Sequence, residues 1–282
     1  MAFSINNNIP ALRAANALAR TSRALGKAYL NIASGEIAPR SNVAGESLAA
    51  ILKADEKLAF AAIRNVNDGI SLVSIAAGGL ENITNVLFRM GEIAEQSANG
   101  VYQQTSRSAL ELEFVALGSE IARIASVTEF NGIKLLMEAG SITLQVGFDS
   151  QSHSQITFAK SLGTLMNLQL GSAAALAIGV IGSTVAASIQ RAAEAITAIQ
   201  EAIAIVGIER GNLGATESRL NSTIQGLQVA HENFAEAVSR IRDVDIADEA
   251  AQLTRLNVLQ QAGVAVLAQA NQQPELVLKL LS

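Results

Sequence analysis

Residues 220–241 read LNSTIQGLQVAHENFAEAVSRI, and this stretch shows the clearest periodicity of the chain. Alternating steps of four and three positions separate Leu220, Ile224, Leu227, His231, Phe234, Val238 and Ile241. Such spacing places all of them on one face of an α-helix, as the a and d positions of a coiled-coil seam. The stretch therefore predicts a helix that packs lengthwise against other helices, and we predict that these residues form a bundle seam.

Two other segments repeat this pattern. One seam, inside a helical pattern that begins near Ala44, comprises Leu80, Ile83, Leu87, Met90 and Ala94. The other comprises Leu110, Phe114, Leu117, Ile121 and Ile124. Because each apolar stripe stays in contact with water unless another helix covers it, we expect the helices to form an antiparallel bundle. We assign residues 44–239 to this bundle domain.

The two ends of the chain carry apolar seams that have no neighbour in sequence. Near the N-terminus, Leu18, Leu25 and Ile32 recur every seven residues, and the glycine of ASG at 33–35 predicts where this helix ends. Between residues 246 and 267, apolar residues occupy every side of a helical wheel, among them Leu253, Leu256, Leu259, Val264 and Leu267. An amphipathic helix has a single apolar stripe. We therefore predict that residues 1–43 and 240–282 form a terminal-helix coiled coil whose C-terminal helix is covered by protein on several sides.

The middle of the chain changes character. Apolar residues alternate in residues 140–159, GSITLQVGFDSQSHSQITFA, on either side of a polar turn, and this predicts a β-hairpin. Residues 160–183 are apolar, glycine-rich and aperiodic, so we expect irregular, partly buried chain there. A helical pattern returns from Thr184, and Gly207, Gly211 and Gly214 predict a bend before or within the following helix.

Composition favours a mainly α protein with long helices and a small β-hairpin. The chain has 282 residues, 50% of them hydrophobic but only 4% aromatic, with three prolines and neither Trp nor Cys. Ala, Leu, Ile and Val therefore supply most of the apolar surface, which suits close packing of long helices. The net charge of −5 gives no basic footprint for nucleic acid or an anionic membrane, and we expect neither as a partner. The N-terminal sequence lacks a basic region followed by an apolar one, so we expect export without a cleavable signal peptide.

Few residues of the sequence are candidates for catalysis or metal binding. His231 occupies a seam position, where a single polar residue usually sets the pairing of helices, and the second histidine, His153, lies in the predicted hairpin turn. With no cysteine and no Glu-x-x-His pairing, we predict no metal site, no cofactor and no catalytic residues. Two other classes of protein are alternatives. A helical-bundle enzyme would need convergent polar residues in the seams, and a membrane-active translocator would need residues 173–206 to be free of charges such as Arg191 and Glu194.

Six motifs closely resemble bacterial flagellin, over roughly residues 1–150 and 185–282. They are NVNDGISLVSIAAGGL at 65–80, TEFNGIKLL at 128–136, ITLQVG at 142–147, RGNLGATESRLNSTI at 210–224, SRIRDVDIADE at 239–249, and LQQAGVAVLAQANQQPELVLKLL at 259–281. The sequence departs from the family pattern in two places. SGEIAPRSNVAGESL at 34–48 lacks the usual acidic pair, so the connection there is expected to take a different path, and the middle is too short for large outer domains.

This resemblance implies a subunit that self-assembles into the extracellular flagellar filament. Hook-associated junction proteins, which share the end segments more loosely, are the alternative. In the family the terminal helices pack against other copies around a central channel, which implies polymerisation through Leu18, Leu25, Ile32, Leu253, Leu256, Leu259, Val264 and Leu267. It also implies an export chaperone, hook-associated proteins and cap proteins as partners. A contact with a host innate-immune receptor would involve Arg89, Glu92, Ile93 and Glu113, although Gly91 stands where the family often has a second arginine.

Overall fold

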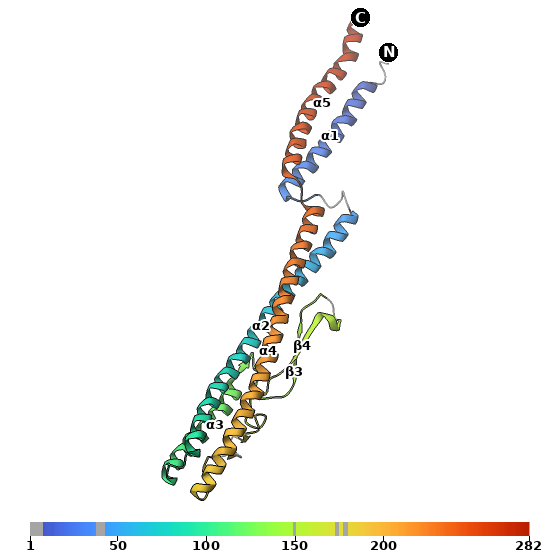
Figure 1. The fold of residues 1–282 in the computed structure, drawn as a ribbon. Coiled ribbons are helices and arrows are strands. Elements are labelled where there is room, and N and C mark those ends of the chain that lie inside the picture. The colour runs from blue at the N-terminus through green and yellow to red at the C-terminus, as the bar shows by residue number, and fades with distance from the viewer. Residues whose placement is uncertain (1–7, 38–42, 149–150, 173–174, 177–179, 282) are drawn as a thin grey trace. The chain divides into compact units, whose positions relative to one another are not determined.

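The computed structural model describes residues 8–37, 43–148, 151–172, 175–176 and 180–281, and five long helices dominate it (Figure 1). They are α1 (Ile9–Ser34), α2 (Val43–Ala98), α3 (Gln104–Val127), α4 (Val185–Arg242) and α5 (Ile246–Leu281). The predicted fold class, mainly α with a small β-hairpin, is therefore confirmed. α4 is continuous helix through Gly207, Gly211 and Gly214, where we had predicted a bend.

The chain divides into two compact units. The terminal unit comprises Met1–Glu56 and Glu232–Ser282, and the central unit comprises Lys57–His231. The sequence had placed this division at 43/44 and 239/240. The terminal unit extends further because Arg242, at the end of α4, pairs with Glu36 at 2.8 Å and with Glu46, near the start of α2, at 3.6 Å. These ion pairs tie the first turns of α2 and the last turns of α4 to the terminal unit.

Local signals define α1. The side chain of Asn8 caps its first turn by accepting a hydrogen bond from the backbone N–H of Ala11 at 3.0 Å, and Pro10 lies in that turn, where proline is well tolerated. The helix ends at Gly35, whose φ of 72° is the left-handed conformation that glycine adopts without strain. The predicted end of the N-terminal helix is therefore confirmed.

In the terminal unit, α1 lies alongside α5 in an antiparallel pair (Figure 1). The amide of Asn8 donates to the carbonyl oxygen of Ala270 at 2.8 Å, and the amide of Asn31 donates to the carboxylate of Glu249 at 3.0 Å. Between these two hydrogen bonds, Leu18 packs over Gly263. The predicted pairing of the terminal helices is confirmed.

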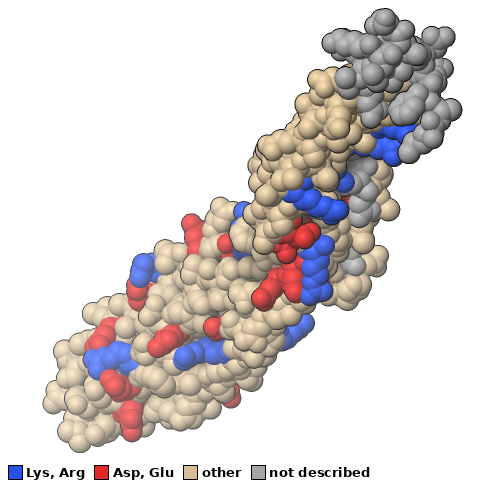
Figure 2. Space-filling model, turned by 90° about the horizontal axis from the view of Figure 1, so that it is seen from above, with Lys and Arg blue, Asp and Glu red and all other residues tan. Residues whose placement is uncertain are grey.

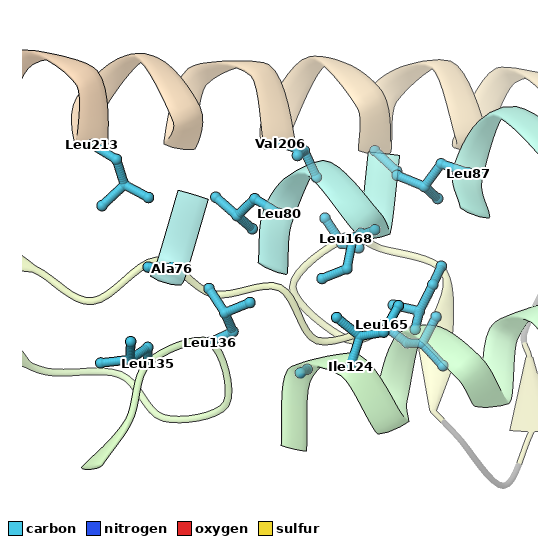
Figure 3. Close-up of a cluster of buried hydrophobic side chains, with 14 of the residues drawn as sticks. Ala76, Leu80, Leu87, Ile124, Leu135, Leu136, Leu165, Leu168, Val206 and Leu213 are labelled. Atoms are coloured by element: carbon cyan, nitrogen blue, oxygen red, sulfur yellow. The ribbon is translucent and has the colours of Figure 1, made fainter. Parts of the chain in front are cut away.

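The core of the central unit lies between its helices and the segments that follow α3. α2 and α4 run antiparallel, since Gly91 faces Ile199 near one end and Gly69 faces Leu220 near the other. All five residues of the predicted α2 seam, from Leu80 to Ala94, are fully buried. Figure 3 shows Leu80 and Leu87 of α2 beside Val206 of α4, with Leu136, Leu165 and Leu168 on the opposite side. The aliphatic composition thus produces one continuous aliphatic core.

Short antiparallel strand pairs complete the central unit. β3 (Ser141–Gln145) pairs with β4 (Gln155–Ala159), with Ile142 opposite Phe158 and Leu144 opposite Ile156, as the alternating pattern predicted. β1 (Glu129–Phe130) and β2 (Ile133–Lys134) form a second, tight hairpin that we had not predicted. Residues 160–183 include the small pair β5 (Gly171–Ser172) and β6 (Ala175–Leu176), and Leu165, Leu168 and Leu170 of this segment are buried.

Candidate functional site

The surface of the terminal helices is the first candidate for function. The side of α5 that faces α1 repeats in steps of four and three along Glu249, Leu253, Leu256, Gln260, Gly263, Leu267 and Ala270, all buried or half-buried. The other sides of α5 are exposed and still apolar. They include Val258, Leu259, Val264 and Val266, of which Leu259 is 46% and Val264 53% exposed. α5 therefore buries one apolar side against α1 and leaves the remaining ones in water.

The predicted polymerisation residues fall into two groups. Those on the α1–α5 seam are Leu18, Leu25, Ile32, Leu253, Leu256 and Leu267, and their side chains are buried or half-buried within the chain itself. Leu259 and Val264 lie on the exposed sides of α5. Other large exposed apolar residues of α5 are Ile246, Val258 and Val266, which lie in the stretch that the sequence predicted to be apolar on every side. The sequence analysis missed the exposed apolar residues of α1, namely Ile9, Leu12, Tyr29 and Leu30.

The predicted bundle seam of α4 lies mostly inward. Leu220, Leu227 and Val238 are buried, and Ile224, His231, Phe234 and Ile241 are half-buried. The imidazole of His231 lies 5.8 Å from the ring of Phe60, centroid to centroid, and the guanidinium of Arg64 stands 5.1 Å over the same ring. The seam histidine is thus part of an aromatic and cationic cluster at one end of the central unit.

The proposed receptor residues form an ion-pair cluster on the surface. The guanidinium of Arg89 binds the carboxylate of Glu113 on α3 at 2.7 Å and that of Glu92, one turn further along α2, at 2.8 Å. These hydrogen bonds, which Arg89 donates to Glu92 and to Glu113, raise the pKa of Arg89 above its usual value, with the bond to Glu92 as the larger cause. Ile93 is fully buried in the core, so it does not belong to this surface, and its side chain is out of reach of a partner. Phe88 and Leu112, each next in sequence to a residue of this cluster, are exposed apolar residues that the sequence analysis overlooked.

A buried arginine lies where α2 turns back into α3. Arg107 is fully buried and donates hydrogen bonds to the carbonyl oxygens of Tyr102 at 3.1 Å and Asn99 at 2.8 Å, and to the hydroxyl of Ser97 at 3.4 Å. Ser97 in turn donates to the carbonyl oxygen of Val180 at 2.8 Å. This network binds carbonyl groups of the turn that follows α2. Its role is to hold the turn.

An open groove of about 640 Å³ lies between the end of the β3–β4 hairpin and α4. Val146, Ile156 and Leu227 form its apolar wall, and His153 and Arg219 bring polar groups to its rim. Within the described ranges, no three or more His, Asp or Glu side chains gather as metal ligands would. Across much of the face in Figure 2, acidic and basic side chains lie next to one another among many uncharged ones.

α2 contains an 18-residue window of mean hydropathy 1.3, so by length and composition alone this helix could cross a membrane. The window is already 39% buried inside the protein. A core helix passes the same test, and the α2 seam is the centre of the core described above. This window is therefore weak evidence for the translocator class.

Long helices whose exposed sides are aliphatic define a structural protein that associates through its surface. Comparison with known protein families identifies which family of structural proteins this is. The model of the bacterial flagellin N-terminal helical region matches residues 5–141, and that of the bacterial flagellin C-terminal helical region matches residues 196–281. The chain belongs to the bacterial flagellin family, which confirms the resemblance drawn from its motifs.

Relatives match nearly the whole chain. A flagellin of Halalkalibacterium halodurans is 38% identical over 280 residues, covering 98% of this chain and 99% of the relative. The flagellar filament 31.3 kDa core protein of Treponema maltophilum is 33% identical over 285 residues, with the same coverage of 98% and 99%. The crystal structure of Bacillus cereus flagellin has a TM-score of 0.46 at 26% identity, covering 58% of this chain and 88% of that one. The chain is accordingly a structural subunit of the flagellar filament, an extracellular appendage.

Proposed function

We propose that this chain polymerises through the exposed apolar sides of α5, with Leu259 and Val264 buried against other copies in the filament. The observation that carries this proposal is that α5 has covered only one of its apolar sides by pairing with α1. Fully burying a valine or leucine side chain is worth about 1.5–3 kcal/mol, so several such residues on each copy provide a strong driving force. A contact between different patches whose rotation does not close produces a helical filament.

The seam residues Leu18, Leu25, Ile32, Leu253, Leu256 and Leu267 then act indirectly. They hold α1 against α5, and this pairing presents the exposed sides of α5 to the neighbouring copy. Isolated helices are marginal in water and gain their stability from packing. We therefore expect changes in these seam residues to weaken both the terminal unit and the filament.

Val264→Asp tests the proposal. Because Val264 is exposed in the single chain, the variant should keep the helical circular dichroism and melting temperature of the parent. In the filament the new carboxylate would be buried without a partner, at a cost of about 3 kcal/mol or more, which corresponds to at least about a hundredfold rise in the critical concentration for assembly. Sedimentation of polymers and negative-stain electron microscopy measure this.

Met166→Asp is the control, since Met166 is an apolar residue in the irregular segment of the central unit that is even more exposed than Val264. It should assemble like the parent chain. Normal filaments from Val264→Asp would contradict the role of α5, and a parent chain that forms no filaments under any condition would contradict the proposal as a whole.

The export route and remaining partners follow the family. We propose export without a cleavable signal peptide, assisted by a flagellar export chaperone, and contact with hook-associated and cap proteins at the filament ends. The support is the membership of the family, together with exposed apolar helix sides that need protection before assembly. Pull-down of the chain with such a chaperone, and its loss after removal of α5, would test the first of these contacts.

We also propose that Arg89, Glu92 and Glu113 form the surface that a host innate-immune receptor contacts. The support is geometric, since one guanidinium links both carboxylates on exposed faces of α2 and α3. Arg89→Ala should abolish any receptor response, whereas Arg123→Ala, which removes a comparable exposed ion pair on α3, should leave it unchanged. An equal response to both variants would contradict the assignment.

A further inference from the structure

The outer face of α1 carries positive charge alone. From Met1 to Gly35 the sequence has no acidic residue, and Arg13, Arg20 and Lys27 recur every seven positions along α1. A step of seven residues returns to nearly the same side of a helix, about 10 Å further along its axis. All three side chains are exposed, although Asn31, one turn after Lys27, is buried against α5 together with Leu25 and Ala28. We call these three residues the basic stripe.

Among the described residues, the basic stripe has no counter-charge on its own chain. No described residue forms an ion pair or a side-chain hydrogen bond with Arg13, Arg20 or Lys27. In the central unit, by contrast, Arg89 and Arg123 are each bound by carboxylates. A row of unpaired charges of one sign attracts a surface of the opposite sign, and this attraction reaches about 10 Å at 0.1 M salt.

A matching acidic segment lies in the same terminal unit, where α4 ends and α5 begins. It comprises Asp243, Asp245, Asp248 and Glu249, with no basic residue until Arg255. Asp243, Asp245 and Asp248 are exposed, and the single guanidinium beside them, that of Arg242, is already bound by Glu36 and Glu46. Asp245 accepts hydrogen bonds from the backbone N–H groups of Ala247 and Asp248, and Glu249 accepts from Asn31, so Asp243 and Asp248 are the carboxylates most available to a partner.

Most of the basic stripe is too far from the acidic segment to pair with it within one chain. Asn31 contacts Glu249 through a hydrogen bond of 3.0 Å, and Lys27 lies one turn of α1 before Asn31. Arg20 lies three turns before Asn31, about 16 Å away along the helix, and Arg13 is about 10 Å further away by the same rise per residue. Arg13 and Arg20 can therefore meet the acidic segment only on a different molecule.

We propose that the basic stripe of α1 binds the acidic segment of a second copy of this chain, and that this head-to-tail contact sets which copies meet during polymerisation. The inference rests on the proposed function, because it assumes that copies assemble side by side. It assigns a different task to α1 than to α5. The apolar sides of α5 supply the driving force, whereas complementary charge on α1 speeds encounter and selects the register.

Charge reversal at Arg20 tests the proposal. Arg20→Glu should raise the critical concentration for assembly about fivefold to tenfold at 0.05 M NaCl, the range for turning one attractive surface pair into a repulsive one. The difference from the parent should vanish near 1 M NaCl, where charges more than about 3 Å apart are screened. Lys57→Glu makes the same change of net charge at an exposed, unpaired lysine of the central unit and should leave the critical concentration unchanged.

A second reversal supplies the decisive measurement. Asp243→Arg and Asp248→Arg, each combined with Arg20→Glu in one chain, are expected to recreate an attractive contact of inverted sign between copies. At least one of the two double variants should return the critical concentration to within about twofold of the parent. Since Arg20 cannot reach these aspartates in its own chain, such rescue reports a contact between molecules.

The outcomes separate the inference from the function it rests on. Filaments of Arg20→Glu with parental critical concentration, or no rescue by either double variant, would overturn the charge pairing while leaving the filament function intact. No filaments from the parent chain would overturn the function itself. Co-sedimentation of the parent with phosphatidylglycerol vesicles, lost in Arg20→Glu, would assign the basic stripe to a membrane and overturn the pairing between copies.

Discussion

Two adjacent glycines in the middle of α2 allow the packing of the central unit to be measured against helix propensity. Gly78 is exposed and a Cβ added there would meet nothing within 4 Å. At Gly79, which is buried, an added Cβ would lie 2.8 Å from Leu136, and 2.9 and 3.0 Å from two atoms of Thr128. Both positions have the same helical neighbours. They therefore share the propensity term and differ only in packing.

Replacing either glycine with alanine should gain about 1 kcal/mol from helix propensity. Gly78→Ala should keep this gain, so its free energy of unfolding should rise by about 1 kcal/mol. Gly79→Ala adds an overpacking cost of about 1–3 kcal/mol, because two neighbours on the segment after α3 must move together. Its free energy of unfolding should therefore be unchanged or fall, by up to about 2 kcal/mol.

Urea unfolding followed by circular dichroism at 222 nm measures both variants. Their difference in unfolding free energy isolates the packing of α2 against Thr128 and Leu136, since the propensity terms cancel. A Gly79→Ala variant as stable as Gly78→Ala would refute the close approach of these elements. A slope of unfolding that differed between the variants would show a change in the unfolded chain instead.

Two further predictions concern polar groups. Arg107→Met should lower the free energy of unfolding by about 3 kcal/mol. The hydrogen bonds that the charged guanidinium donates to Asn99 and Tyr102 contribute about 1.5–3 kcal/mol each, and burial of the apolar methionine side chain offsets part of their loss. Urea unfolding measures the change. A hydrogen bond from Arg123 lowers the pKa of Glu120 on the exposed face of α3, so Arg123→Gln should return that pKa toward its usual value in an NMR titration. Because the pKa of Glu120 is lower in the folded than in the unfolded chain, the ion pair contributes a small stabilisation at neutral pH, and this stabilisation is lost as the pH falls through the folded pKa.

The helices and their pairings were predictable because their determinants are local and periodic. Steps of four and three identified the buried side of α2 from Leu80 to Ala94, and the apolar residues on all sides of α5 indicated contacts beyond the chain. The β3–β4 hairpin followed from alternation around a polar turn. Each of these signals repeats several times, so one exception such as His231 does not obscure it.

Single-residue features were missed for physical reasons. Arg107 lies seven residues before Phe114 and so continues the α3 seam. A charged residue is not expected to be buried, and the burial of Arg107 depends on carbonyl groups of a turn that no sequence pattern predicts. Asn131 and Gly132 form the tight turn between β1 and β2 with φ of 49° and 78°. An Asn-Gly pair is typical of a two-residue hairpin turn, so this hairpin could have been predicted from the sequence. Ile93 was misassigned to the surface because matching a motif does not tell which side of α2 faces the core.

The hydrogen bonds that join α1 to α5 link residues separated by 218 and 262 positions in the sequence. Contacts this remote carry a large loop-closure entropy and are slow to form from an open chain. If the central unit folds first, the loop that must still close shrinks to about 40 residues, which reduces that entropic cost by about 1.4 kcal/mol. The chain topology therefore favours folding of the central unit before the terminal helices join. A chain whose central unit has folded can still have both of its terminal helices unpaired.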